Sequence, residues 1–358
     1  MSPSLINIYN NLWNRLIDTT YLTDDTLNSF RKLFILTSLF FLIPNYLWIG
    51  NIPDALYNPP RLSFAVFFSG FPDYTIILLI HILLIITLML IGINRLIKLS
   101  GIIYFLLIVL LLGFIYSLGK ISHGFILFPI TILCFSLNNW SSSLKKSKTL
   151  PIPSESLLAI IIAFGMFTAG FQKCFSWIDF NIDYSGFLHW FYPGYYNWGK
   201  NYLMASSVFS IPRHIIELFD YLVVIFELSP FIILLSGKRI LWKLWLLIAC
   251  LFHISNIVLL NIPFLLHAMV YLPFIFPMFL TDLFSRISNK IYNPIIIAIG
   301  FFQILLLFSK EHTIYSYFIS RYETTLYVSL FFFITIFIFG LFSLIDSIRT
   351  RQPTPYDL

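Results

Sequence analysis

Two neighbouring stretches decide the fold: YTIILLIHILLIITLMLIGI at residues 74–93 and LSGIIYFLLIVLLLGFIYSL at residues 99–118. A helix needs about 20 apolar residues to cross the hydrocarbon core of a bilayer, which is about 30 Å thick. Both stretches have this length, and neither contains Asp, Glu, Lys or Arg. Between them lie Arg95 and Lys98, in the connection NRLIK. The sequence therefore predicts two consecutive membrane-spanning helices here.

The composition of the whole chain agrees with this interpretation. Of its 358 residues, 59% are hydrophobic, 19% are aromatic and only 11% are charged. Soluble domains carry roughly 25% charged residues, and so few charges cannot cover so much apolar surface in water. A disordered chain is excluded as well, since disorder needs low hydrophobicity and high charge. The sequence predicts an all-α polytopic membrane helix bundle, and its net charge of +6 is expected to reflect basic cytoplasmic loops rather than binding to nucleic acid.

Apolar runs along the chain predict about ten transmembrane helices. Their ranges are 32–50, 74–93, 99–118, 122–138, 155–174, 214–237, 240–261, 264–281, 293–309 and 326–346. The runs at 122–138 and 264–281 are the weakest, because they are short or contain proline. Segment 61–70, RLSFAVFFSG, is too short to span and is expected at the interface.

The distribution of Lys and Arg predicts the orientation. With a cytoplasmic N-terminus and ten crossings, fifteen of the 22 basic residues fall on the inner side and seven on the outer side. Basic residues favour the cytoplasmic side, so both termini are expected there. The polar segment 1–31 does not resemble a cleavable signal. The predicted location is the cell membrane, and the Ile-, Asn-, Lys- and Phe-rich composition suggests the cytoplasmic membrane of a bacterium.

These predictions give a simple domain organisation. Residues 1–31 form an N-terminal cytoplasmic segment, residues 32–346 form a single transmembrane domain, and residues 347–358 form a C-terminal tail. The Ser-, Lys- and Pro-rich stretch 138–153 is the best internal linker. Segment 175–213 is rich in Trp, Tyr and Phe, which prefer the membrane interface. It is expected to form short helices and turns on the outer face.

Lys173 is the first candidate for chemistry, since an ionisable group at membrane depth is costly and therefore a functional hypothesis by default. It ends the helix predicted at 155–174, and Gly165 and Ala169 precede it on roughly the same face. Small residues indicate close helix packing, so Lys173 is expected to point into the bundle as a partly desolvated base. The alternative is a lysine that snorkels from the helix end to water.

The next helix carries acids on one stripe. Asp220 and Glu227 lie within about 20° of each other around a helix, and Arg213 lies close to the same line. Acids on one stripe of a membrane helix are not expected to face lipid. Glu227 is the deepest, so it should pair with a Lys, a His or a hydroxyl, or be protonated. A purely structural interhelical hydrogen bond is the alternative.

Further polar residues complete the candidate site. His253 and Asn256 share a face of the helix predicted at 240–261, where His253 is either a proton carrier or a packing residue. Lys120 and His123 fall at the same outer side as Lys173. The candidates for substrate contact in the outer segment are Trp177, Asp179, His189 and Trp190.

Other chemistry is absent from the sequence patterns. There is no GxSxG elbow, phosphate-binding loop or HExxH motif, and no Cys/His cluster has the spacing of a zinc site. The three cysteines are widely spaced, so no disulfide framework or metal site is predicted.

Several of these motifs together resemble one family. The stretches are FTAGFQKCFSWIDF (167–180), IFELSPFIILL (225–235), LFHISNIVLLNIPF (251–264) and SLGKISHGFILFPITILCFS (117–136). They resemble the horizontally transferred transmembrane domain (HTTM) family, which is similar to vitamin K-dependent γ-glutamyl carboxylase. The resemblance covers roughly residues 30–285, and its anchors are Ala-Gly-x-x-Lys at a helix end and a later Phe-His-x-x-Asn.

The resemblance implies a mechanism. Lys173 would be the base that deprotonates a reduced quinone of the vitamin K type at the outer membrane face, with His253 and Asn256 as supporting polar groups. Oxygen would then convert the deprotonated quinol to an epoxide. The strong base that forms in this step would remove a γ-proton from a glutamate of a peptide. This chain departs from the carboxylase in two respects. Gln172 stands where the enzyme has a second lysine, and the sequence ends soon after its last predicted helix, where the enzyme has a large extramembrane region that takes part in substrate handling.

Three functional hypotheses follow. The first is a membrane enzyme, carboxylase-like or oxidoreductase-like, whose lysine base acts on a lipophilic quinol-type substrate or a secreted peptide. The second is a non-enzymatic membrane partner in the maturation of, or immunity to, a secreted peptide, which the two departures favour. The third is a small-molecule transporter, although the two halves contain no matching broken helices. Lipid is an expected partner in each case.

Overall fold

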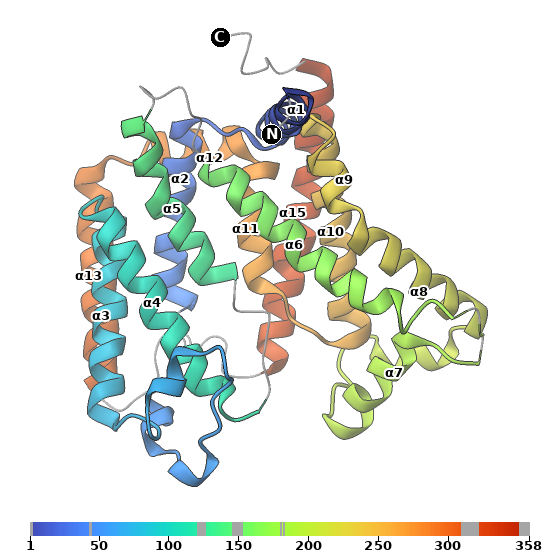
Figure 1. The fold of residues 1–358 in the computed structure, drawn as a ribbon, viewed down its shortest axis with the longest axis horizontal. Helices are drawn as coiled ribbons and strands as arrows, with labels where there is room; N and C mark the ends of the chain where they lie inside the picture. Colours follow the sequence, from blue (N-terminus) through green and yellow to red (C-terminus); the bar gives the residue numbers. More distant parts are fainter. Residues whose placement is uncertain are drawn as a thin grey trace. The chain divides into compact units, whose positions relative to one another are not determined.

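The computed structural model of the chain describes residues 3–42, 45–119, 127–144, 153–179, 181, 183–308 and 322–350. All regular structure in these residues is helical (Figure 1). Six of the helices are long and apolar enough to cross a membrane, or seven if the short helices α11 and α12 form one broken span. The prediction of an all-α chain with several apolar helices of membrane-spanning length is therefore confirmed for the described residues, where six or seven such spans stand against the ten predicted.

The chain forms two compact units, and each is built from separate parts of the sequence. Unit 1 contains residues 1–22, 155–276 and 325–358, and unit 2 contains residues 23–154 and 277–324. The helices of unit 1 are α1 (Pro3–Thr20), α6 (Ser154–Cys174), α7 (Gly186–Tyr192), α8 (Arg213–Leu228), α9 (Pro230–Leu234), α10 (Arg239–Leu260), α11 (Leu265–Ile275) and α15 (Tyr322–Thr350). Those of unit 2 are α2 (Asp24–Thr37), α3 (Tyr74–Gly92), α4 (Ile97–Tyr116), α5 (Leu127–Leu144), α12 (Pro277–Ser285) and α13 (Asn289–Phe308).

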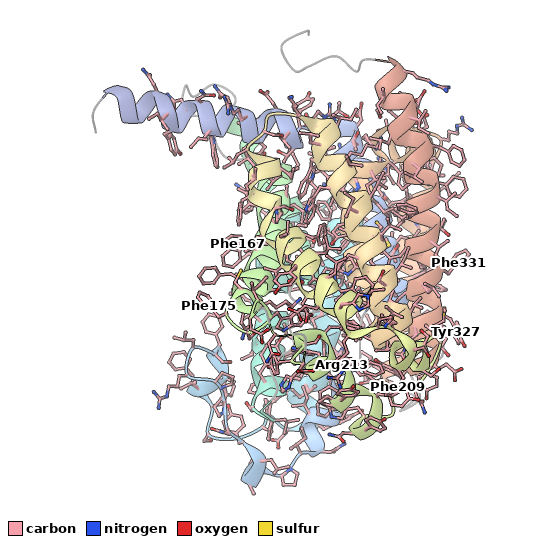
Figure 2. All side chains as sticks on the ribbon, turned by 90° about the vertical axis from the view of Figure 1, so that its right-hand side faces the viewer. Phe167, Phe175, Phe209, Arg213, Tyr327 and Phe331 are labelled. Carbon is pink, nitrogen blue, oxygen red and sulfur yellow. The ribbon has the colours of Figure 1, made fainter. Side chains whose placement is uncertain are left out.

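In unit 1, α10 is the central helix and packs against α1, α9 and α11 (Figure 1). The ammonium of Lys243 on α10 ties this helix to α15, because it donates to the carbonyl of Ser343 at 2.8 Å and to the hydroxyls of Ser343 and Ser347 at 2.8 and 2.9 Å. This lysine is buried and satisfied, so it has a structural role. Large rings cover the outside: Phe175 and Phe331 are 78% and 67% exposed, and both point away from the ribbon in Figure 2.

In unit 2, α3 packs against α2, α4 and α13, and α4 also packs against α5. Helix α2 begins at a clear start signal, since the side chain of Thr23 accepts a hydrogen bond from the backbone of Thr26 and Asp24 and Asp25 follow in the first turn. Helix α2 continues as a π-helical turn, Ser38–Leu42, and is followed by a 3₁₀ turn, Leu47–Asn51. The apolar run at 32–50 is thus not one regular helix.

Other boundaries follow the sequence pattern where no proline intervenes. The helices α3, α4, α6 and α10 match the apolar runs predicted for them to within two residues. The run at 214–237 is divided into α8 and α9 because Pro230 has no N–H to continue the hydrogen-bond ladder. Helix α5 extends to Leu144, so the first part of the stretch expected as a linker is helical.

Segment 61–70 forms no long helix, as expected. Its only regular structure is a 3₁₀ turn, Phe64–Phe67. The side chains of Leu62 and Phe67 are almost fully exposed, whereas Ala65 is buried and its carbonyl accepts a hydrogen bond from the Tyr57 hydroxyl. An apolar segment that is anchored on one side and open on the other suits a membrane interface.

Candidate functional site

Lys173 and Glu227 form an ion pair in unit 1. Lys173 lies in the last turn of α6 and Glu227 in the last turn of α8, and their Nζ and Oε1 atoms are 2.6 Å apart. Both sequence expectations for these residues are confirmed: Lys173 points toward another helix, and Glu227 pairs with a lysine. The side chain of Glu227 is only 3% exposed, whereas that of Lys173 is 21% exposed. The carboxylate is therefore enclosed and the ammonium is partly accessible.

A glycine brings the two helices together. A Cβ atom placed on Gly170 would lie 2.7 Å from the Cβ of Glu227 and 3.1 Å from the backbone nitrogen of Leu228. Only a residue without a side chain allows this approach. The sequence pointed instead to Gly165 and Ala169. Gly165 is the wrong residue for this contact, because it is exposed and no atom of the described residues lies within 4 Å of such a Cβ, whereas Ala169 is half-buried. Gly170 is one turn from Lys173, so it shares its face more closely.

Aromatic rings cover the ammonium of Lys173. Its Nζ lies 4.7 Å from the ring centroid of Trp177 and 6.0 Å from that of Phe252. Trp177 follows Lys173 by four residues, and its backbone N–H donates to the Lys173 carbonyl at 2.7 Å, which continues the helical turn and keeps both side chains on one face. The π faces attract the cation and exclude water from most of its surface.

One acceptor atom of the site is unused. The Oε1 atom of Glu227 binds Lys173, and Oε2 is buried without a hydrogen-bond partner among the described residues. A buried acceptor without a donor is costly, so such an atom is a place where a proton or a polar ligand gains the most. The pair therefore combines a partly accessible ammonium with a buried carboxylate, one oxygen of which accepts no hydrogen bond from the described residues.

Helix α8 has its polar side inward and its apolar side outward. Its buried residues include Glu217, Asp220 and Glu227, while Leu222 and Ile225 are 52% and 64% exposed. In water this arrangement would be reversed. Acids facing the protein and aliphatic residues facing outward are expected where the surroundings are lipid.

Asp220 holds the start of α7 rather than reaching Lys173. Its Oδ2 accepts from the hydroxyl of Ser185 at 2.7 Å, and its Oδ1 accepts from the backbone N–H of Phe187 at 2.9 Å. The Ser185 oxygen in turn caps α7 by accepting from Leu188. Asp220 therefore anchors residues 175–213, which we term the aromatic lobe, to α8.

The aromatic lobe consists of short helices and turns, as the sequence predicted. It contains α7, a π-helical turn at Pro193–Asn197 and a 3₁₀ turn at Ala205–Ser210, and Phe187, Phe191 and Val208 are buried in its small core. Figure 2 labels Phe209 and Arg213, which mark its C-terminal part. Of the four candidate substrate contacts in this lobe, only Trp177 contacts Lys173; Asp179, His189 and Trp190 are exposed.

His253 belongs to a different cluster. It is 1% exposed, its Nε2 lies 3.0 Å from the hydroxyl of Tyr271, and its ring centroid lies 4.4 Å from that of Phe264 and 5.3 Å from that of His267. Its Nδ1 has no partner among the described residues. The neighbouring Phe252 is the residue of this motif that reaches Lys173. His253 thus packs behind the ion pair and does not complete it.

Asn256 is half-buried at the end of α10, and its carbonyl accepts from the backbone N–H of Ile262. The more informative asparagine is Asn261, which the sequence analysis missed. It adopts a left-handed conformation with φ of 51°, and its amide pairs with both backbone groups of Tyr202, at 2.7 and 3.0 Å. An Asn directly after a helix is a known stop signal and could have been recognised. The hydrogen bonds between Asn261 and Tyr202 of the aromatic lobe could not be recognised from the sequence.

Two candidates remain. Lys120 and His123 lie outside the residues that the structure describes. Across the described ranges, no group of three or more His, Cys, Asp or Glu residues could hold a metal ion. No known family model, curated protein or solved structure matches this chain.

Proposed function

We propose that the chain is a multi-pass membrane enzyme in which Lys173 acts as a base on a lipophilic acidic substrate, with Glu227 as its proton partner. The observation that carries this proposal is the 2.6 Å contact between Nζ and Oε1, combined with the unpartnered Oε2. A purely structural ion pair is more stable when both carboxylate oxygens accept hydrogen bonds. This pair leaves one free and keeps its cation accessible.

The proposed chemistry makes two proton transfers, whose net result is that one proton leaves the substrate and one proton is held by Glu227. Lys173 passes a proton to Glu227, which leaves a neutral amine beside a protonated carboxyl group. The amine then accepts the proton of the substrate hydroxyl, so that the substrate becomes an anion and Lys173 an ammonium again. The new anion lies next to this ammonium, and the aromatic rings of Trp177 and Phe252 keep water away from both.

A reduced quinone fits the residues present. When bound, it supplies an acidic aromatic hydroxyl on an apolar body. Trp177 and Phe252 offer ring faces to such a body, and Lys173 is the polar group that would meet its hydroxyl. The resemblance to the HTTM family and the carboxylase supports the same class of ligand. Carboxylation of a secreted peptide would be a later step.

The proposed setting is the cytoplasmic membrane of a bacterium, with ten crossings and both termini inside. The ten-crossing arrangement requires α2, α5, α8 with α9, and α11 with α12 to complete the six long apolar helices. The excess of Lys and Arg on the inner side supports this orientation.

The proposal is tested with an isoprenylated naphthohydroquinone in nanodiscs that contain the full chain, kept free of oxygen. The readout is the fraction of bound probe in its anionic form, followed by absorbance at constant pH. Because arginine cannot be deprotonated, Lys173→Arg should lower this fraction at least about tenfold, as should Glu227→Gln. Lys200→Arg, the same change on a lysine that contacts Trp198, serves as the control.

Two results would overturn the proposal. If Lys173→Arg forms as much anion as the native chain, the lysine is only a cation. If the probe binds with no anion in any variant, the pair has no basic role toward quinols. Binding of the probe without a change of absorbance therefore counts against the enzyme as clearly as the first result does.

A second candidate, a non-enzymatic partner of a secreted peptide, is favoured by the surface of the aromatic lobe. Trp190, Tyr196 and Trp198 are 55%, 67% and 55% exposed, and aromatic residues are typical of binding hot spots. A photoreactive amino acid at position 190 should then crosslink a peptide in cells, and Lys173→Arg should not change the yield. Crosslinks to lipid alone would exclude this function.

A further inference from the structure

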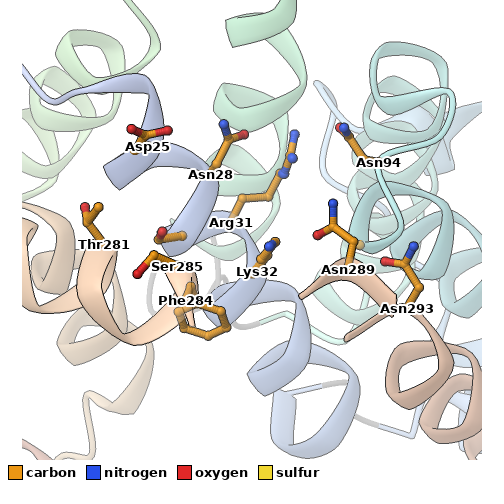
Figure 3. A pocket seen from close by; sticks show the side chains of 12 residues that line it. Asp25, Asn28, Arg31, Lys32, Asn94, Thr281, Phe284, Ser285, Asn289 and Asn293 are labelled. Atoms are coloured by element: carbon orange, nitrogen blue, oxygen red, sulfur yellow. The ribbon is translucent and has the colours of Figure 1, made fainter. Parts of the chain in front are cut away.

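Unit 2 contains a polar pocket that the proposed chemistry does not use. Its volume is about 360 Å³, within the roughly 300–1,000 Å³ of small-molecule sites. It is lined by residues of α2, of the end of α3 and the turn that follows it, of α12 and of the start of α13. These residues are Asp25, Asn28, Ser29, Arg31, Lys32, Gly92, Asn94, Thr281, Phe284, Ser285, Asn289 and Asn293 (Figure 3).

Arg31 is the central residue of this pocket. Its side chain is only 7% exposed, and its Nε atom is buried without a hydrogen-bond partner among the described residues. In Figure 3 the guanidinium extends across the middle of the pocket, with Asn28 on one side and Asn94 and Asn289 on the other. A buried guanidinium with an unused donor is costly and calls for an acceptor, most favourably an anion.

A second cation lies beside it. Lys32 is half-buried, and its Nζ lies 5.5 Å from the ring centroid of Tyr292. The phenol of Tyr292 does not act as a counter-ion, because its hydroxyl donates to the Lys32 carbonyl at 2.8 Å. The one carboxylate in the lining, that of Asp25, is on an exposed residue. Two adjacent cationic residues thus line a pocket whose lining contains one carboxylate, on an exposed residue.

The neutral groups of the lining suit an oxyanion. Asn28, Asn94, Asn289 and Asn293 each carry an amide with two N–H donors. Asn289 and Asn293 are one turn apart at the start of the 20-residue helix α13, whose positive end also favours an anion. Asn94 is an exposed member of the lining and has a left-handed backbone conformation, with φ of 62°.

We propose that this pocket binds a phosphate group, with Arg31 as its principal ligand. The planar guanidinium can donate two parallel hydrogen bonds to phosphate oxygens, Lys32 adds a second charge, and the asparagines complete the shell. The volume leaves room for a small organic group beyond the phosphate. The phosphate belongs either to the headgroup of an anionic lipid or to a soluble phosphoester.

The experiment measures binding to the full chain and separates these two sources. Nanodiscs of phosphatidylcholine receive increasing phosphatidylglycerol, and detergent-purified protein receives glycerol 3-phosphate. Arg31→Met should weaken the binding of whichever probe is recognised by about 10- to 100-fold, since hydrogen bonds to charged groups are worth about 1.5–3 kcal/mol. Arg95→Met, which removes the same charge from an exposed residue outside the lining, should change it less than about twofold.

Each outcome decides the proposal. Tight binding of glycerol 3-phosphate supports a soluble ligand, and binding of phosphatidylglycerol alone supports a lipid headgroup. Equal losses for Arg31→Met and Arg95→Met would show only general attraction between charges and overturn it, as would the absence of binding to either probe. If Arg31→Met fails to fold, Lys32→Met and Asn289→Leu replace it, and both must weaken binding for the proposal to hold.

Discussion

The Nζ atom of Lys173 and the Oε1 atom of Glu227 lie 2.6 Å apart at the C-terminal ends of two helices, α6 and α8. A helix C-terminus carries partial negative charge, which stabilises a lysine but destabilises a glutamate. Glu227 therefore depends on Lys173 more than Lys173 depends on Glu227. The stability of unit 1 should be sensitive to which partner is removed.

Removal of Lys173 is the first prediction. Lys173→Met should lower the free energy of unfolding by about 3 kcal/mol, because it leaves a buried carboxylate without a cation. The double variant Lys173→Met with Glu227→Leu should recover most of this loss. Unfolding in mixed detergent micelles measures both. Additive losses in the double variant would contradict the pairing. As a control, breaking the exposed pair Arg213–Asp183 should change the free energy of unfolding by less than about 1 kcal/mol.

The anchor of the aromatic lobe gives the second prediction. Asp220→Ala removes the acceptor of both Ser185 and Phe187 and should cost about 1–3 kcal/mol of local stability. Protease cleavage near the start of α7 should then become faster, as measured by mass spectrometry of the fragments. Asp179→Ala, which removes one exposed hydrogen bond to Asn181, should leave the cleavage rate unchanged. Equal rates for both variants would show that Asp220 is not the anchor.

Asn261 provides the third prediction through a graded series. Asn261→Ala loses both hydrogen bonds to Tyr202 and strains the left-handed backbone, whereas Asn261→Gly loses only the bonds. The alanine variant should therefore be less stable than the glycine variant by about 1 kcal/mol. Thermal unfolding of the purified chain measures the order. A glycine variant that is the less stable of the two would show that backbone conformation is not limiting.

Membrane orientation is the fourth prediction. Asn201 in the aromatic lobe and Arg95 between α3 and α4 are both exposed. A cysteine at position 201 should react with a membrane-impermeant maleimide in intact cells, and a cysteine at position 95 should react only after permeabilisation. A background with Cys174→Ser removes the half-buried native thiol, since Cys134 and Cys250 are buried. The reverse labelling pattern would invert the proposed topology.

The long apolar helices could be predicted from the sequence because their signal is local. Each of α3, α4, α6 and α10 contains a window of 18 residues with high mean hydropathy and at most two Asp, Glu, Lys or Arg residues, so a local search for apolar runs finds them without knowledge of neighbouring helices. Helix α1 was missed for the opposite reason. It is an amphipathic helix of mixed composition, with Leu16 buried and Ile8 and Tyr9 exposed, and a search for apolar runs does not detect such a pattern.

The candidate site could be predicted only in part. The cost of a buried charge was enough to select Lys173 and to require a partner for Glu227. It could not identify the two as partners, because the contact joins residues 54 positions apart through the packing of α6 on α8. For the same reason His253 could be recognised as buried, whereas its bond to Tyr271, across the bend into α11, could not.

Gly170 has a consequence for how the site can be altered. Because a methyl group at this position would collide with the backbone and side chain of residue 227, each larger side chain there must drive α6 and α8 apart. A series from glycine through alanine to valine would lengthen the distance between amine and carboxylate step by step without substituting Lys173 or Glu227. The attraction between the ammonium of Lys173 and the carboxylate of Glu227 can thus be weakened by substitutions at Gly170, a residue that carries no charge.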